Sequence, residues 1–203
     1  MRATSDIWEV VTMNELKHYG VKGMHWGIRR YQPYPSDKTI FVSGSSKTQT
    51  KGSPYKRKRL HKDIKKNLKS HMKNNDKIIV GDAPGIDRQV QKYLKRKNYK
   101  HVEVYGPGEK VRYSANKKWK TNPINDKRTK EGSKAWLAAK DKKMTKDATE
   151  GLAIVLDKGA KATRKNIDRL MQQGKEVDIF ELSSKGRKYD RWIRNGVGKL
   201  RIK

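Results

Sequence analysis

Short β-branched runs alternate with amphipathic stretches over most of this sequence, and no other feature constrains its fold as strongly. The runs fall at residues 38–44, 76–82, 101–106, 151–156 and 175–182. Between them apolar residues recur at helical spacing, first at Leu60, Ile64, Leu68 and Met72, then over 86–94 and 167–171, and the alanine, lysine and leucine content of 131–149 indicates a further helix. Strands that alternate with helices pair in parallel, with helices on both faces of the sheet. The pattern predicts an α/β, Rossmann-like three-layer sandwich whose five-stranded parallel sheet has the order 3-2-1-4-5.

The regular pattern leaves a segment at each end of the predicted domain, which covers residues 37–182. Residues 1–36 are rich in glycine, proline and aromatic residues near their end and fit neither a helix nor a strand, so we expect a docking segment. Residues 183–203 are strongly basic and are predicted to form an exposed tail. Within the domain, the polar and basic stretch 107–130 is predicted to be a long loop.

Charge and composition narrow the possible partners. Lysine and arginine total 51 against 21 acidic residues, which gives a formal net charge of +30 spread along the chain. Such a charge favours non-specific binding of nucleic acid or another polyanion. The alternative is that the charged residues only keep the surface solvated. No stretch approaches the roughly 18 to 20 apolar residues of a membrane span. We therefore expect no membrane partner.

Other features bear on location and metal binding. We expect no secretory signal peptide, since the first residues carry acids and lack a continuous apolar run. The sequence has no cysteine, which excludes disulfides and cysteine-ligated zinc. His18 and His25 have no third ligand at a useful spacing, so no metal site is predicted.

Three loops follow predicted strands at the edge where parallel sheets bind ligands: 44–46, 81–85 and 157–163. Their glycines allow close approach of the backbone, and the N–H groups of residues 85–87, at a helix start, favour an anion. The predicted ligand-binding residues are Gly44, Ser45, Ser46, Gly81, Asp82, Gly85, Asp87, Lys158, Lys161 and Thr163. Asp87 also complements the helix dipole, and that structural role remains an alternative. Asp87 and Asp141 are the candidate acid or base groups.

The segment GDAPGIDRQVQKYL resembles the Gly-Gly-Ala-x-Gly-x-Asp turn of the SLOG superfamily, the group related to YspA, DprA and LOG proteins. FVSGSS is similar to the first strand and loop of that superfamily. The later motifs correspond to Lys140, Asp141, Met144, Ala148, Gly151, Leu152, Thr163, Asn166, Gly174 and Lys175. The resemblance implies a nucleotide or nucleotide-derived ligand, and for some relatives cleavage of an N-glycosidic bond. Asp82, Ser46 and Ala162 depart from the superfamily pattern, and these departures weigh against catalysis more than against binding.

The stretch HYGVKGMHWG, residues 18–27, resembles a short tag of head-associated proteins in tailed bacteriophages that infect Gram-positive hosts. The resemblance implies attachment to the virion through residues such as His18, Tyr19 and Trp26. The alternative is an aromatic clasp packed on the protein's own domain.

Together these features favour a phage-encoded, virion-associated protein that binds a nucleotide-type small molecule without a further cofactor. Its location would be the virion or the host bacterial cytoplasm, and its partners a capsid or head protein and non-specific nucleic acid. One alternative is a non-enzymatic basic structural protein that contacts packaged DNA or the capsid interior. The other is an N-glycosidic-bond hydrolase that acts on a nucleotide.

Overall fold

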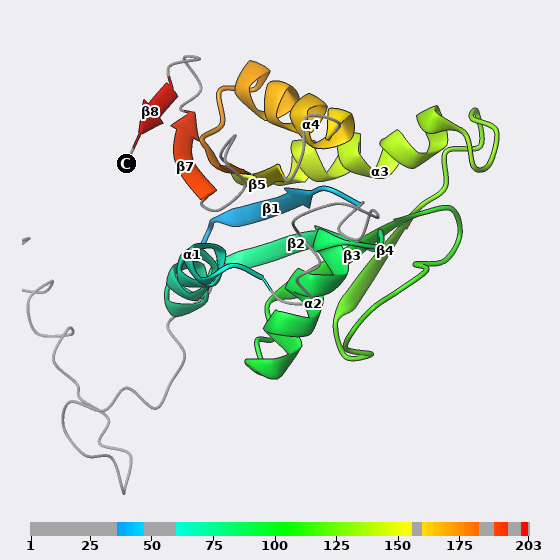
Figure 1. Cartoon of the computed structure of the whole chain (residues 1–203). Coiled ribbons are helices and arrows are strands. Elements are labelled where there is room, and N and C mark those ends of the chain that lie inside the picture. Colours follow the sequence, from blue (N-terminus) through cyan, green and yellow to red (C-terminus); the bar gives the residue numbers. More distant parts are fainter. Residues whose placement is uncertain (1–35, 47–59, 156–159, 183–188, 195–199, 203) are drawn as a thin grey trace, which may run out of the picture. The chain divides into compact units, whose positions relative to one another are not determined.

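A β-sheet of eight strands organises the part of the chain that this computed structural model describes (Figure 1). The described residues are 36–46, 60–155, 160–182, 189–194 and 200–202, and side chains are described up to residue 181. The chain divides into two units, and all of the described residues belong to the second, Pro33–Lys203.

The order of the strands across the sheet is β4-β3-β2-β1-β5-β6-β7-β8. The strands are β1 Thr39–Gly44, β2 Lys77–Gly81, β3 Val102–Pro107, β4 Lys120–Ile124, β5 Glu150–Val155, β6 Val177–Leu182, β7 Tyr189–Arg194 and β8 Leu200–Ile202. The first six in spatial order pair in parallel, and β1 lies between β2 and β5. The order expected for the five predicted strands, which are β1, β2, β3, β5 and β6, is therefore confirmed.

Helices cover both faces of the sheet, as the three-layer prediction requires. Helices α1 (Lys62–Lys73) and α2 (Ile86–Arg96) lie on one face, and α3 (Lys134–Asp147) and α4 (Lys161–Gln172) on the other (Figure 1). Because successive strand residues point to opposite faces, Ile40 and Val42 of β1 join the core beneath α1 and α2, whereas Phe41 joins the core beneath α3 and α4. None of these four helices is long and apolar enough to cross a membrane.

The prediction of a loop throughout residues 107–130 is wrong, because β4 forms within it and pairs with β3. Lys120, Thr121 and Pro123 of β4 are exposed, so the strand lacks the buried apolar run that marks a central strand. Proline has no N–H to donate to a ladder and is found in strands mainly at sheet edges. Because β4 lies at the edge of the sheet, its sequence lacks the apolar pattern by which the buried strands were predicted.

The expected C-terminal tail also contains regular structure. Strands β7 and β8 extend the sheet beyond β6 by antiparallel pairing, with Ile179 opposite Trp192 and Ile193 opposite Arg201. The segment 183–203 is therefore not wholly a tail, and the sheet continues past the expected boundary at residue 182. Removing this segment would remove two strands along with its charges.

Candidate functional site

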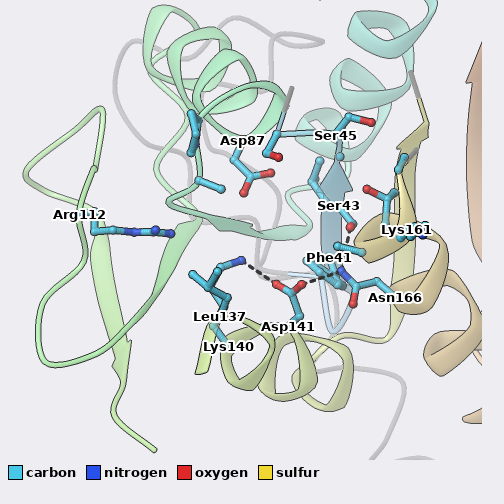
Figure 2. Close-up of a pocket in the computed structure, with 18 residues that line it drawn as sticks. Phe41, Ser43, Ser45, Asp87, Arg112, Leu137, Lys140, Asp141, Lys161 and Asn166 are labelled. Atoms are coloured by element: carbon cyan, nitrogen blue, oxygen red, sulfur yellow. Dashed lines mark hydrogen bonds and ion pairs between the residues drawn. The ribbon is translucent and has the colours of Figure 1, made fainter. Parts of the chain in front are cut away.

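A pocket of about 600 Å³ opens at the carboxyl ends of the central strands, and 18 residues line it (Figure 2). Its floor is the end of β1 with the loop that follows, and its walls come from the β2–α2 turn, from α3 and from the start of α4. Strand β1 is the point at which the chain order reverses, since β2 lies on one side of it and β5 on the other. This is the edge at which ligands bind in open parallel sheets.

The pocket gathers most of the predicted site residues. It is lined by Gly44, Ser45, Ser46, Asp87, Asp141, Lys161 and Thr163. Gly81, Asp82 and Gly85 do not line it, although they were expected in the ligand site. Lys158 lies outside the described residues, as do His18, Tyr19 and Trp26 of the expected docking segment.

Within the β2–α2 turn, Ala83 and Pro84 line the pocket, whereas Gly85 and Ile86 contact the loop that follows β1. Gly85 has a φ of 90°, and a Cβ added there would lie 2.6 Å from the carbonyl oxygen of Ser45 and even closer to that of Ser46. The backbone N–H of Ile86 donates to the Ser45 carbonyl at 3.2 Å. The space beside Gly85 is therefore filled by the backbone of the loop after β1, and the N–H of Ile86 already has an acceptor; contact of residues 85 and 87 with a ligand stays a prediction. Gly85 lets the two loops approach each other.

Asp82 forms a second contact of this turn with the protein itself. Its carboxylate is fully buried and accepts hydrogen bonds from the backbone N–H and Nε of Arg112, both at 2.9 Å. Nη2 of Arg112 contacts the other carboxylate oxygen at 2.5 Å. These hydrogen bonds raise the pKa of the Arg112 guanidinium further above its ordinary value. Asp82 thus fixes Arg112, which does line the pocket, on the side opposite Lys161 (Figure 2).

A chain of polar contacts crosses the base of the pocket (Figure 2). Lys140 of α3 donates to Asp141 at 2.6 Å, and the amide of Asn166 of α4 donates to the other Asp141 oxygen at 3.1 Å. The same Asn166 amide lies 3.0 Å from the hydroxyl oxygen of Ser43. These contacts join β1, α3 and α4, so the position of the Asp141 carboxylate is fixed from both sides.

Asp87 is the buried carboxyl group nearest this chain of contacts. Burial raises its pKa to about 7, against the opposing effect of the Lys140 ammonium. Burial by itself would lower the pKa of Lys140, but the carboxylates of Asp141 and Asp87 outweigh it, and the net shift is upward. Lys140 therefore stays charged, while Asp87 is divided between its protonated and ionised forms near neutral pH.

Gly81 makes room for this arrangement. An added Cβ at residue 81 would lie 2.9 Å from Nζ of Lys140 and closer still to the carboxylate of Asp87. Its contribution is therefore to the packing of the charged groups behind the pocket, and not to contact with a ligand.

The start of α4 forms another wall of the pocket. No side chain caps this helix, and its first intrahelical hydrogen bond runs from the N–H of Arg164 to the carbonyl of Ala160. The N–H groups of Lys161, Ala162 and Thr163 accordingly have no intrahelical acceptor. All three residues line the pocket. Helix α3 is different, since its first turn is capped by the Ser133 hydroxyl, which accepts from the N–H of Trp136.

Two pocket residues, Arg112 and Leu137, were not predicted from the sequence, and two others, Lys140 and Asn166, were found only through the family resemblance. Arg112 and Leu137 carry no motif, and nothing in the spacing of the polar stretch 107–130 places Arg112 at the pocket. Lys140 was singled out solely as part of the SLOG-like pattern. The unusual Asp82 was the one available signal, because a buried carboxylate requires a cationic partner. In the described part of the chain no cluster of His, Asp and Glu is suited to hold a metal ion.

Comparison with known proteins covers only the beginning of the chain. The model of a family of unknown function (DUF7211) matches residues 9–33, which include the HYGVKGMHWG stretch and lie outside the described residues. No curated protein and no solved structure matches the chain significantly. The chemistry of the pocket therefore rests on its geometry.

Proposed function

We propose that the pocket binds a nucleotide or nucleotide-derived molecule whose phosphate lies at the N-terminus of α4. The observation that carries the proposal is the uncapped first turn of α4, residues 161–163, which opens onto the pocket. N–H groups without an intrahelical acceptor and the helix dipole together favour a phosphate. The Lys161 side chain adds positive charge on the same side. The pocket volume is within the range of small-molecule sites.

The carboxyl groups deeper in the pocket suit the sugar of such a ligand. Asp141 is held by Lys140 and Asn166, and its carboxylate retains acceptor capacity for a hydroxyl. Asp87, with a pKa of about 7, can either accept from or donate to a polar group. The order of the central strands and the position of Asp87 and Asp141 support the SLOG-like interpretation of the sequence, which remains part of this proposal.

Calorimetric titration of the full-length chain with a panel of nucleoside monophosphates and the matching nucleosides tests the proposal. We expect the phosphate-bearing ligands to bind, and the nucleosides to bind at least about tenfold more weakly, because they lack the group that α4 recognises. Failure of every nucleotide to bind would contradict the proposal and favour the non-enzymatic structural alternative.

A matched pair of variants places the phosphate. Ala162→Glu puts a negative charge in the first turn of α4, where it complements the helix dipole but repels an anionic ligand. Ala135→Glu puts the same charge at the equivalent position of α3, which does not line the pocket. Both variants should keep the melting temperature of the wild type, and only Ala162→Glu should lose nucleotide binding. Equal affinities for the two variants would contradict a phosphate site at α4.

A second function, hydrolysis of an N-glycosidic bond, is favoured by the two carboxyl groups in one pocket. Protonated Asp87 would give its proton to the departing base, and ionised Asp141 would stabilise positive charge on the sugar. Water then adds hydroxide to the sugar carbon and returns a proton to Asp87. Chromatography of nucleotides incubated with the protein should reveal the free base, and Asp87→Asn should abolish its release. If a nucleotide binds but no free base is released, the hydrolase proposal is contradicted and the proposal of nucleotide binding without catalysis remains.

A separate proposal concerns the N-terminal segment, which lies outside the described residues. The family model matches residues 9–33 and none of the described sheet domain, which supports treating the segment as a unit of its own. We propose that it attaches the protein to a phage particle through aromatic anchors. Tyr19→Ala with Trp26→Ala should leave the melting temperature unchanged and abolish incorporation into particles. A lower melting temperature with normal incorporation would instead favour a clasp on the protein's own domain.

A further inference from the structure

The two helical layers differ in how their basic residues are paired. Helices α1 and α2 together contain nine lysines and arginines, and so do α3 and α4. On α3 and α4 several of these residues are neutralised: Lys143 pairs with Asp147 at 2.6 Å, Lys140 with Asp141, and Arg164 with Glu181. The number of basic residues is the same, so any difference between the layers arises from pairing.

On α1 and α2 most of the basic side chains are exposed and have no acidic partner among the described residues. The exposed members are Lys62, Lys66, Lys69 and Lys73 of α1 and Arg88, Lys92, Lys95 and Arg96 of α2. None of the eight forms an ion pair with another described residue; Arg88 lies over the ring of Tyr113. Of the two acids on these helices, Asp87 is buried beside the pocket, which leaves only Asp63 near the surface.

These side chains form two neighbouring rows, which we call the α1–α2 basic face. Along each helix the members follow one another at intervals of three or four residues, apart from the adjacent Lys95 and Arg96, and such an interval corresponds to about 4.5 to 6 Å of helix axis. The two helices are in direct contact, since the Tyr93 hydroxyl of α2 donates to the Lys65 carbonyl of α1 at 3.4 Å. Like charges at this spacing repel and destabilise a helix slightly. A regular array of negative charges would relieve that repulsion along both rows.

The side chains of the α1–α2 basic face favour nucleic acid over an anionic membrane as its partner. A helix that adsorbs to lipid turns apolar side chains toward the bilayer. Here the apolar residues of both helices, such as Ile64, Leu68, Val90 and Leu94, are buried in the core beneath them. In the described part of the chain the one exposed large hydrophobic side chain is Leu137, on α3. The α1–α2 basic face offers charge and nothing to insert, which suits a phosphate backbone.

We propose that the α1–α2 basic face binds the phosphate backbone of nucleic acid without sequence preference. The face lies on two helices of one layer, none of its eight residues lines the pocket, and of α1 and α2 only the buried Asp87 does. Binding there is therefore independent of the nucleotide ligand proposed above, and either proposal can fail without the other.

Two full-length variants, each lacking four positive charges, test the proposal. The first carries Lys66→Gln, Lys69→Gln, Lys92→Gln and Lys95→Gln on the α1–α2 basic face. The control carries Lys134→Gln, Lys142→Gln, Lys146→Gln and Lys165→Gln on α3 and α4, where the four lysines are equally exposed and have no ion pair with a described residue. Both variants therefore change the net charge by the same amount.

Binding is measured by fluorescence anisotropy with a short DNA duplex and a shuffled duplex, over a series of salt concentrations. The first variant should lose at least about tenfold in affinity for both duplexes, and the slope of log affinity against log salt should become shallower by about 3 to 4, as expected for four lost phosphate contacts. The control variant should stay close to the wild type. Equal losses in the two variants, or no loss in the first, would overturn the proposal.

Vesicles containing phosphatidylglycerol serve as the second probe. Wild-type protein that binds these vesicles, and that excess duplex does not release, would identify a membrane as the partner and overturn the proposal. Release of any bound vesicles by duplex supports it.

Discussion

The β2–α2 turn and the start of α4 lie at the same edge of the sheet and belong to loops that the sequence analysis treated alike, yet the structure uses them differently. Gly85 lies against the Ser45 and Ser46 carbonyls, and Asp82 is hydrogen-bonded to Arg112, so these two residues of the first turn contact the protein itself and not the pocket. Residues 161–163 of α4 have no side-chain cap and line the pocket. A glycine-rich turn after a strand thus signals that something approaches closely, but not whether it is a ligand or another loop.

The largest effect on the free energy of unfolding is expected for a substitution in the β2–α2 turn. Gly85→Val should lower the free energy of unfolding by about 3 kcal/mol or more, because the side chain would overlap two carbonyl oxygens at a positive φ. Gly174→Val is the matched control: its φ is 72°, but no atom lies within 4 Å of the added Cβ, so only backbone strain of about 1 kcal/mol is expected. Urea denaturation of both variants measures the difference.

The proposed difference between the β2–α2 turn and the start of α4 would be contradicted if Gly85→Val were as stable as Gly174→Val and had lost nucleotide binding. That result would mean that the added side chain occupies ligand space, and the β2–α2 turn would then be the phosphate site.

A smaller effect is expected from opening the Asp82 contact. Arg112→Met keeps the aliphatic stem but leaves a buried carboxylate without its cation, which should destabilise the protein by about 2 kcal/mol given that Arg112 is partly exposed. Arg128→Met removes an ion pair with Asp126 whose arginine is 91% exposed, so its effect should be within about 0.5 kcal/mol. Thermal and urea denaturation check both values. Equal losses would show that burial of Asp82 does not govern this contact.

The strands show which parts of the fold could be predicted from the sequence. Apolar periodicity found the five strands and their order, because buried strands such as Phe41–Val42 in β1 have to be hydrophobic on both faces. It did not find β4, whose exposed residues and Pro123 carry no such signal, nor β7 and β8, which are rich in charged residues. β4 is an edge strand with exposed residues, so its composition resembles that of a loop.

The same reasoning explains the result for the site. The ends of β1 and α4 were predictable, since topology alone brings them together at the switch point. The pairing of Asp82 with Arg112 was not, because it joins residues 30 positions apart through a stretch with no periodic pattern. The role of Gly85 depends on where the Ser45–Ser46 backbone lies, which local sequence does not encode.

The protonation of Asp87 gives a third, still smaller effect. Its folded pKa of about 7 exceeds the unfolded value of about 3.9, so the folded state holds the proton more tightly. The resulting stability is fully present below the unfolded pKa and is lost as the pH rises through 7. Between about pH 6 and pH 8 the wild type should lose about 1 kcal/mol relative to Asp87→Asn, which has no proton to release. Denaturation of both proteins across this range measures it, and parallel pH profiles would contradict the burial of this carboxyl.

The smallest expected effect concerns the Lys161 side chain, which is exposed and so contributes a screened charge. Lys161→Gln should weaken nucleotide binding about two- to fivefold by calorimetry, since the backbone N–H groups remain in place. Lys165→Gln, an exposed lysine of the same helix that does not line the pocket, is the control and should bind like the wild type. A loss of all binding in Lys161→Gln would transfer the main recognition of phosphate from the backbone to this side chain.

The most direct test of the difference between the two turns is a titration of the ¹⁵N-labelled protein with inorganic phosphate, followed by amide chemical shifts. The account predicts that the N–H signals of residues 161–163 shift with phosphate and saturate together. The N–H signals of Gly85, Asp87 and Ile86, whose N–H donates to the Ser45 carbonyl, should not shift. Saturating shifts at residues 85–87, with none at residues 161–163, would contradict it.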